Sequence, residues 1–195
     1  MNREKSLKLL RKYIKNENLV RHGLAVEAVM KRLCKYFKKS AISGPSLGGE
    51  DEIEKWTTAG LLHDIDWELT AKTPEEHGKK AAEILKEEGY EKDVIRAIKV
   101  HNYTLELPLE TLMEKVLFCT EELTGLITAC ALVNPKKLSG VKVSSVKKKF
   151  KQPSFARGVD RKIIAMAPDL IGLSLEELIE LSLEAMMEIK TDLGL

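Results

Sequence analysis

Apolar residues recur at helical spacing along most of this chain, and that periodicity constrains the fold more than any other feature. In residues 3–15, for example, Leu7, Leu10 and Ile14 lie on one face of a basic amphipathic helix. Lys and Glu are abundant, whereas Val, Thr and aromatic residues do not gather in the alternating runs typical of strands. We therefore predict an all-α bundle of about seven to nine helices. The other helices are expected near residues 19–37, 52–64, 74–88, 91–101, 109–133 and 175–192.

Length and composition favour one well-packed domain. The chain has 195 residues, of which 44% are hydrophobic and 32% charged, so a sizeable core lies beneath a solvated surface. We expect a single domain over residues 1–195, with its core at about residues 19–133 and with residues 134–195 packed on that core. Residues 39–50 include four Gly or Pro and predict a loop. This loop either borders the site described below or simply joins two helices.

The sequence indicates a cytoplasmic protein. No apolar run approaches the ~20 residues that a membrane span needs, and the first residues mix charges without an apolar stretch of signal length. Cys34, Cys119 and Cys130 lie in apolar helical contexts and show no CxxC spacing. An odd number of such thiols favours a reducing compartment over a disulfide framework and argues against cysteine as a metal ligand.

Residues 59–67 (AGLLHDIDW) carry the strongest chemical signal. An apolar run ends in His63 and Asp64, and a second carboxylate and a Trp follow. Adjacent residues near a helix end are about 100° apart around its axis, so both side chains can reach one inward point. An imidazole nitrogen with a carboxylate oxygen suits a divalent transition metal. The alternative is a structural hydrogen bond that fixes the helix end.

The other histidines favour the metal interpretation. The chain has four, His22, His63, His77 and His101, and each falls on or beside a predicted apolar helix face or helix end. His22 shares the apolar face of its helix, and His101 closes the helix at residues 91–101. Since none lies in a loop rich in Gly or Ser, all four are candidate ligands.

His77 follows a helix-start signal. Thr73 is a good N-cap, Pro74 suits the first helical position, and Glu76 would complete a capping box. Gly89 is expected to end that helix. This places His77 in the first turn, where the helix dipole should lower its proton affinity and keep it neutral for metal binding.

The order of these residues resembles that of the HD superfamily of metal-dependent phosphohydrolases, in which ligands from separate helices converge on one site. Residues 117–125 (LFCTEELTG) look like the last motif of that family, with Glu121 where the family usually has Asp. The resemblance implies either that Glu121 ligates through a side chain one methylene longer or that it lies behind the ligands, with Glu122 solvated. It also implies that His77 binds a second ion, as in the two-metal branch of the superfamily.

The resemblance extends over nearly the whole chain, from His22 to the last helix. Residues 123–129 (LTGLITA), 144–150 (SSVKKKF) and 155–161 (FARGVDR) look like a bacterial-type, HDIG-type family of small HD-domain proteins predicted to be hydrolases. This resemblance implies the fold and the metal site. It does not specify a substrate.

Residues 136–162 are strongly basic. They hold eight Lys, two Arg and one Asp, a net charge of +9, whereas the rest of the chain carries −7. Apolar residues interleave with these charges, so we expect an ordered segment held against the core. Lys148, Lys149, Arg157 and Arg161 are predicted to bind substrate phosphates. A nucleic-acid surface is less well supported, because aromatics for stacking are few and no nucleic-acid motif occurs.

Together these features predict a metal-dependent phosphohydrolase that acts on a nucleotide or a related small phosphorylated molecule. Six mixed donors suit two ions ~3.5–4 Å apart, with Asp64 as the bridge and with a hydroxide that attacks in line. Asp64 and His63 are the predicted catalytic residues, and the metal is expected to be Mn, Fe, Ni, Zn or Co. The predicted ligands are His22, His63, Asp64, His77, His101 and Glu121.

Three other interpretations remain open. The same ligands would serve a di-iron oxygenase of the HD type. The Glu at position 121 allows a degenerate binding or regulatory protein that holds little metal. The basic segment allows a nucleic-acid-binding module, whose affinity would fall steeply with salt. No membrane association is expected. The broad apolar face of the last helix packs on the core or forms a homo-oligomer surface.

Overall fold

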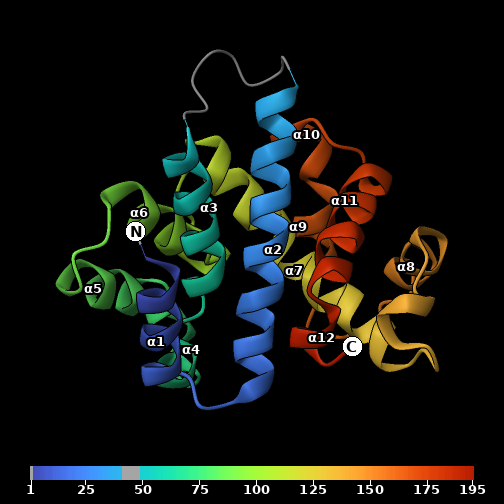
Figure 1. The fold of residues 1–195 in the computed structure, drawn as a ribbon, viewed down its shortest axis with the longest axis horizontal. Helices are drawn as coiled ribbons and strands as arrows, with labels where there is room; N and C mark the ends of the chain where they lie inside the picture. Colours follow the sequence, from blue (N-terminus) through green and yellow to red (C-terminus); the bar gives the residue numbers. More distant parts are fainter. Residues whose placement is uncertain (1, 41–48) are drawn as a thin grey trace.

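The computed structural model describes residues 2–40 and 49–195 and shows a helical bundle (Figure 1). Within these residues there is no strand, and eight helices have eight or more residues, which confirms the predicted fold class. Those helices are α1 (Arg3–Tyr13), α2 (Glu17–Lys39), α3 (Glu50–Leu62), α5 (Lys79–Glu87), α6 (Lys92–Val100), α7 (Leu112–Leu132), α8 (Val143–Phe150) and α11 (Leu175–Glu188). Shorter elements are α4 (Trp67–Thr70), α9 (Arg161–Ala165), α10 (Ala167–Ile171), α12 (Lys190–Leu193) and the 3₁₀ turns η2 (Pro74–Glu76), η3 (Tyr103–Leu105) and η4 (Lys137–Gly140).

Helix α2 runs through the middle of the bundle and packs against α3, α7 and α11 (Figure 1). Its apolar stripe, which includes Val26, Met30 and Leu33, is fully buried. Burying one large apolar side chain stabilises a fold by about 1.5–3 kcal/mol. This stripe therefore contributes a major part of the stability of the core.

Two glycines bring α2 and α3 into close contact. A Cβ at Gly60 of α3 would lie 2.9 Å from the backbone of Glu27 and of Val26, and a Cβ at Gly23 of α2 would lie 2.8 Å from the carbonyl oxygen of Leu61. Only glycine fits these positions without moving a backbone. The close approach sets His22 on α2 beside the end of α3, where the His-Asp pair lies.

Helix α7 supplies the other wall of the core. It begins at a capping box. The Thr111 side chain accepts from the backbone N–H of Glu114, and the Glu114 carboxylate accepts from the backbone N–H of Thr111. Arg96 of α6 also pairs with Glu114, at 3.1 Å. These contacts fix the start of α7 and so the register that turns Glu121 toward the site.

The segment after α7 packs against the core. Val146 is fully buried, and Phe150, Phe155 and Val159 are partly buried against the main cluster. The guanidinium of Arg161 holds this segment together by donating to backbone carbonyls of residues 150, 152, 155, 156 and 159.

The residue before Glu50 caps the helix that leads to the His-Asp pair: Gly49 is the N-cap of α3, and Asp51 lies in its first turn. A capping box of Ser174 and Glu177 starts α11, but this helix ends at Glu188 and not near residue 192 as predicted, because Ile189 leaves helical geometry, with φ −116° and ψ 19°. The predicted loop at residues 39–50 falls largely on residues 41–48, so its relation to the site lies outside the described residues.

In the part of the chain that the structure describes, no helix is both long and apolar enough to cross a lipid bilayer.

Candidate metal centre

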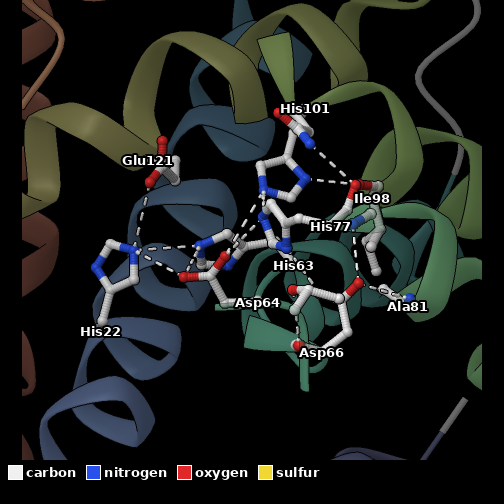
Figure 2. Close-up of polar contacts among 12 residues, drawn as sticks. His22, His63, Asp64, Asp66, His77, Ala81, Ile98, His101 and Glu121 are labelled. Atoms are coloured by element: carbon white, nitrogen blue, oxygen red, sulfur yellow. Dashed lines mark hydrogen bonds and ion pairs between the residues drawn. The ribbon is translucent and has the colours of Figure 1, made fainter. Parts of the chain in front are cut away.

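Six side chains from five parts of the bundle converge on one point (Figure 2). His22 comes from α2, the His-Asp pair from the end of α3, His101 from the end of α6, and Glu121 from the middle of α7, while His77 comes from the link between η2 and α5. The structure thus brings together all six residues that the sequence analysis singled out as ligands. They are His22, His63, Asp64, His77, His101 and Glu121.

The carboxylate of Asp64 lies at the centre of this cluster, with a pair of imidazoles at each oxygen. Its Oδ2 is 3.8 Å from Nε2 of His22 and 3.5 Å from Nε2 of His63. Its Oδ1 is 3.3 Å from Nε2 of His77 and 3.7 Å from Nε2 of His101. The carboxylate of Asp64 therefore lies between two pairs of imidazole nitrogens, a mixed set of donors that could hold a metal ion.

Hydrogen bonds behind the rings fix which nitrogen faces the centre. Nδ1 of His63 lies 2.8 Å from the carbonyl oxygen of Gly60, and Nδ1 of His101 lies 2.5 Å from that of Ile98. A carbonyl only accepts, so each Nδ1 carries a proton and each ring turns its Nε2 atom inward.

The ring of His22 is held in the same sense. Its Nδ1 is 3.4 Å from the hydroxyl of Thr124, and that hydroxyl donates its own proton to the carbonyl oxygen of Glu121 at 2.7 Å. The hydroxyl therefore accepts from Nδ1 of His22, and the Nε2 atom of the ring faces the centre, 3.7 Å from the Glu121 carboxylate. Sequence analysis did not identify Thr124, because a Thr inside a helix carries no signal of such a role.

The sequence analysis also did not identify Asp66, which orients the ring of His77. It is fully buried, and its Oδ1 accepts from Nδ1 of His77 at 2.8 Å, while its Oδ2 accepts from the backbone N–H groups of Gly78 and Ala81 at 2.8 and 2.9 Å. A carboxylate behind a ligand histidine orients the ring and raises its basicity. The available signal was the second carboxylate two residues after Asp64.

The predicted setting of His77 is wrong. Thr73 makes no side-chain cap bond, Pro74–Glu76 forms only a 3₁₀ turn, and His77 is extended at its end, before Gly78 at φ 80°. The side-chain amide of Asn102 donates to the carbonyl oxygen of His77 and holds it there. Helix α5 starts after His77, with Asp66 as its cap, so no helix turn surrounds this histidine.

The protonation of His77 also differs from the prediction. Burial lowers the pKa of His77, but hydrogen bonds and charge from Asp64 and Asp66 outweigh burial and raise it to about 10. Burial lowers the pKa of His63 to about 4. His77 therefore carries a proton that a bound metal ion would have to displace, whereas His63 stays neutral over the physiological range.

The two central carboxylates keep their negative charge despite burial. Burial raises the pKa of Asp64, but the surrounding imidazoles, His63 first, lower it well below its usual value. Burial likewise raises the pKa of Glu121, and a hydrogen bond with His22 reverses the direction. For His22, burial lowers the pKa and Glu121 raises it, with a net increase. Anionic oxygens thus lie among the inward-facing imidazole nitrogens.

This donor set fits divalent transition metals. The Nε2 atoms of His22 and His63 are 3.2 Å apart, and those of His77 and His101 are 3.1 Å apart. Two lone pairs at such distances require a proton or a metal ion between them. Among the described residues, two groups of potential ligand atoms lie within 4.8 Å of one another, His22 with His63 and Glu121, and His63 with Asp64 and His101.

A cavity of ≈ 240 Å³ opens onto the cluster. Asp64, His77, His101 and Glu121 form part of its lining, and Trp67 and Tyr103 add aromatic walls that remain 44% and 53% exposed. The remaining lining residues are Thr70, Ala71, Pro74, Asn102, Thr104, Glu122 and Gly158. A small organic molecule can therefore reach the inward-facing donors.

Glu122 is less solvated than expected. It is half-buried in the same wall as Glu121, and its Oε2 accepts from the backbone N–H of Asp160 at 2.9 Å. Burial, followed by the charge of Glu121, raises the pKa of Glu122 to about 7.

The four cations predicted to bind phosphate do not line this cavity. Lys148 and Lys149 line a different cavity beside Cys130, and Arg161 is bound to backbone carbonyls. Arg157 is exposed and precedes Gly158 at the cavity wall. Their predicted role receives no support from this geometry.

Comparison with known proteins gives a family. The family model of the HD domain matches residues 19–131, a span that includes all six clustered residues. No curated protein and no solved structure matches the chain. Since the matched span covers more than half of the 195 residues, this chain belongs to the HD domain family.

Proposed function

We propose that this protein is a metal-dependent phosphohydrolase that cleaves a phosphate ester of a nucleotide or a related small molecule. One observation carries the proposal: each oxygen of Asp64 faces a pair of inward Nε2 atoms, one pair from His22 and His63 and the other from His77 and His101. Membership of the HD family, whose members are typically metal-dependent phosphohydrolases, supports the same reaction class.

The six side chains would supply the ligands for two ions. His22, His63 and Glu121 would hold one ion, His77 and His101 the other, and Asp64 would contribute one oxygen to each. Two divalent ions of Mn, Fe, Ni, Zn or Co in such a site lower the pKa of a bound water and polarise a phosphoryl oxygen.

The protein itself contributes orientation and shape. The carbonyls of Gly60 and Ile98 and the carboxylate of Asp66 hold three rings with Nε2 inward, so the donors are placed before any ligand arrives. The exposed faces of Trp67 and Tyr103 offer a planar base or other apolar group a place to stack at the cavity.

Phosphate release from a panel of phosphate esters tests the proposal. The protein would be purified without chelators, reconstituted with each candidate metal, and compared with Asp64→Ala. We expect release by the wild type and none by the variant, with helical circular dichroism largely unchanged. Asp169→Ala, an exposed carboxylate in α10, is the matched control and should keep full activity.

Two results would contradict the proposal. Turnover retained by Asp64→Ala would remove the central carboxylate from the chemistry. Oxygen consumption with an organophosphonate or polyol, without phosphate release, would instead assign the same ligands to an oxygenase.

A further inference from the structure

The exposed aromatic residues of this chain gather at one cavity. The chain has two Trp, four Tyr and four Phe, all of which lie in the described residues 2–40 and 49–195. Trp67 and Tyr103 are 44% and 53% exposed, whereas the others are buried or half-buried. Both line the cavity that opens onto the metal centre. A lone exposed aromatic side chain needs no explanation, but two at one cavity beside polar groups indicate a ligand site.

Trp67 is attached to the metal centre at two points. Its backbone N–H donates to the carbonyl oxygen of Asp64 at 2.9 Å. Its indole ring contacts the ring of His77 edge to face, with 5.2 Å between the ring centroids and 90° between the planes. The other tryptophan, Trp56, is fully buried and its indole N–H donates to Glu52, so it belongs to the core. Trp67 instead keeps an exposed aromatic surface next to the clustered donors.

Tyr103 is attached to the same centre through its neighbour Asn102. The buried side-chain amide of Asn102 donates to the carbonyl oxygen of His77 at 3.0 Å. Its side-chain oxygen accepts from the backbone N–H of Thr104 at 3.0 Å and so caps the η3 turn that begins with Tyr103. One side chain therefore positions both a predicted ligand and the turn that carries the second aromatic ring.

The size of the cavity suits a single small molecule. Its volume of ≈ 240 Å³ is below the ~300–1,000 Å³ typical of sites for drug-sized ligands. Besides the two aromatic side chains and the clustered donors, the lining includes short side chains such as those of Ala71 and Thr104. A phosphate at the clustered donors and a planar ring at Trp67 and Tyr103 would share this space, so both ends of one small molecule can be held at once.

We propose that Trp67 and Tyr103 form a binding site for a planar ring and that the substrate is a phosphate ester whose organic part carries one such ring. This inference rests on the proposed function and narrows its substrate class. Nucleobases and aryl groups share the flat π face on which stacking depends. Sugar and glycerol phosphates lack that face, so the two aromatic residues discriminate against them.

The kinetic test uses two pairs of esters that differ only in the ring. Adenosine 5′-monophosphate is compared with ribose 5-phosphate, and benzyl phosphate with its saturated analogue cyclohexylmethyl phosphate. In at least one pair the ester with the planar ring should have a kcat/KM higher by at least about fivefold, from the usual strength of base–aromatic stacking. The pair with the larger preference identifies the ring as a nucleobase or as an aryl group. Absence of a preference in both pairs would overturn the inference.

Variants test the two residues named. Trp67→Leu and Tyr103→Leu each remove the ring and keep an apolar side chain. Each should lower kcat/KM for the preferred ester by at least about fivefold, chiefly through KM, and change that for its ring-free partner by less than about twofold. Trp67→Phe should restore most of the loss. Leu69→Ala, an exposed residue of α4 outside the cavity lining, is the matched control and should change neither value.

A different outcome would assign Trp67 to the metal centre instead. The indole contacts the ring of His77, so its loss could act through that predicted ligand. In that case Trp67→Leu would lower kcat/KM equally for both esters of a pair. Such an equal loss would overturn the role of Trp67 in ring recognition.

A binding test gives a readout that does not depend on turnover. Adenosine and benzyl alcohol, which carry a ring without a phosphate, would be titrated into the protein while tryptophan fluorescence is followed. Stacking should quench the exposed Trp67, whereas the fully buried Trp56 supplies a constant background. Ribose should cause no quenching, and Tyr103→Leu should weaken binding of the ring compound severalfold. Absence of quenching by both ring compounds would overturn the inference.

The outcomes separate the two proposals. Phosphate release with no preference for a ring in either pair would overturn the ring selectivity alone. Quenching by a ring compound without phosphate release from any ester would contradict the proposed hydrolase and still support the ring site.

Discussion

Asp66 and His77 form a buried carboxylate–imidazole pair, with 2.8 Å between Oδ1 and Nδ1, and the other oxygen of Asp66 caps helix α5. One side chain therefore both aims a predicted ligand and starts the helix that follows it. This link joins the stability of the α4–α5 region to the geometry of the metal centre.

Replacing Asp66 with Asn should weaken metal binding. The amide can serve His77 through its oxygen, but its NH₂ then faces the N–H groups of Gly78 and Ala81, which lose their acceptor. We expect a loss of about 10–100-fold in metal affinity, the usual effect of removing the partner of a ligand histidine. Competition with a fluorescent chelator measures it.

Glu75→Gln is the control for this experiment, because Glu75 is exposed in the neighbouring η2 turn. It should bind metal as the wild type does. An unchanged metal affinity in Asp66→Asn would show that Asp66 has a structural role alone.

Replacing Gly60 with Ala should destabilise the protein. The new Cβ would meet the backbones of Glu27 and Val26 at 2.9 Å, so α2 and α3 must separate. We expect a loss of about 1–3 kcal/mol in the free energy of unfolding, typical of overpacking. Urea denaturation followed by circular dichroism provides the measurement.

Gly125→Ala in α7 is the matched control for Gly60→Ala. Its Cβ would meet only the Val159 side chain at an ordinary 3.6 Å. Since Ala favours helix over Gly by about 1 kcal/mol, this variant should be neutral or more stable. A destabilised Gly125→Ala with an unaffected Gly60→Ala would contradict the packing described for these helices.

Replacing Arg161 with Ala should lower stability rather than substrate affinity. Its guanidinium donates to carbonyls of Phe150, Gln152 and Val159 among others. Each hydrogen bond from this charged donor contributes at most about 1.5–3 kcal/mol to the free energy of unfolding. We expect a clear drop in melting temperature and a KM within about twofold of the wild type for the folded enzyme.

Arg157→Ala, which removes an exposed cation from the same segment, should change neither quantity. A large rise in KM for Arg161→Ala at unchanged melting temperature would restore the phosphate-binding role that the sequence suggested.

The fold could be predicted because its signal is repeated along the chain. The apolar stripe of α2 and the apolar run before His63 each specify a buried face, and a histidine on such a face must point inward. His22, His63, His77 and His101 therefore became candidates from their positions on or beside predicted helix faces and ends, together with the chemical signal of the His63–Asp64 pair. The resemblance to the HD superfamily added Glu121 and the significance of His77.

The remaining features depend on contacts that are distant in sequence. Thr73 and Pro74 form a plausible local helix start, but Asp66 caps α5 from twelve residues before Gly78, and no local pattern predicts that. Likewise, a run of basic residues does not reveal that Arg161 binds backbone carbonyls of its own segment. Local sequence signals favoured a cap from neighbouring residues and a phosphate contact for Arg161. In the tertiary structure the cap comes from Asp66, and Arg161 binds backbone carbonyls.

Metal content per chain tests the central claim most directly. Elemental analysis would be done on protein purified without chelators or a His-tag and then incubated with Mn, Fe, Ni or Zn. The two imidazole pairs at Asp64 predict about two equivalents of a divalent transition metal per chain. No bound metal under any of these conditions would contradict the metal centre and the hydrolase that rests on it.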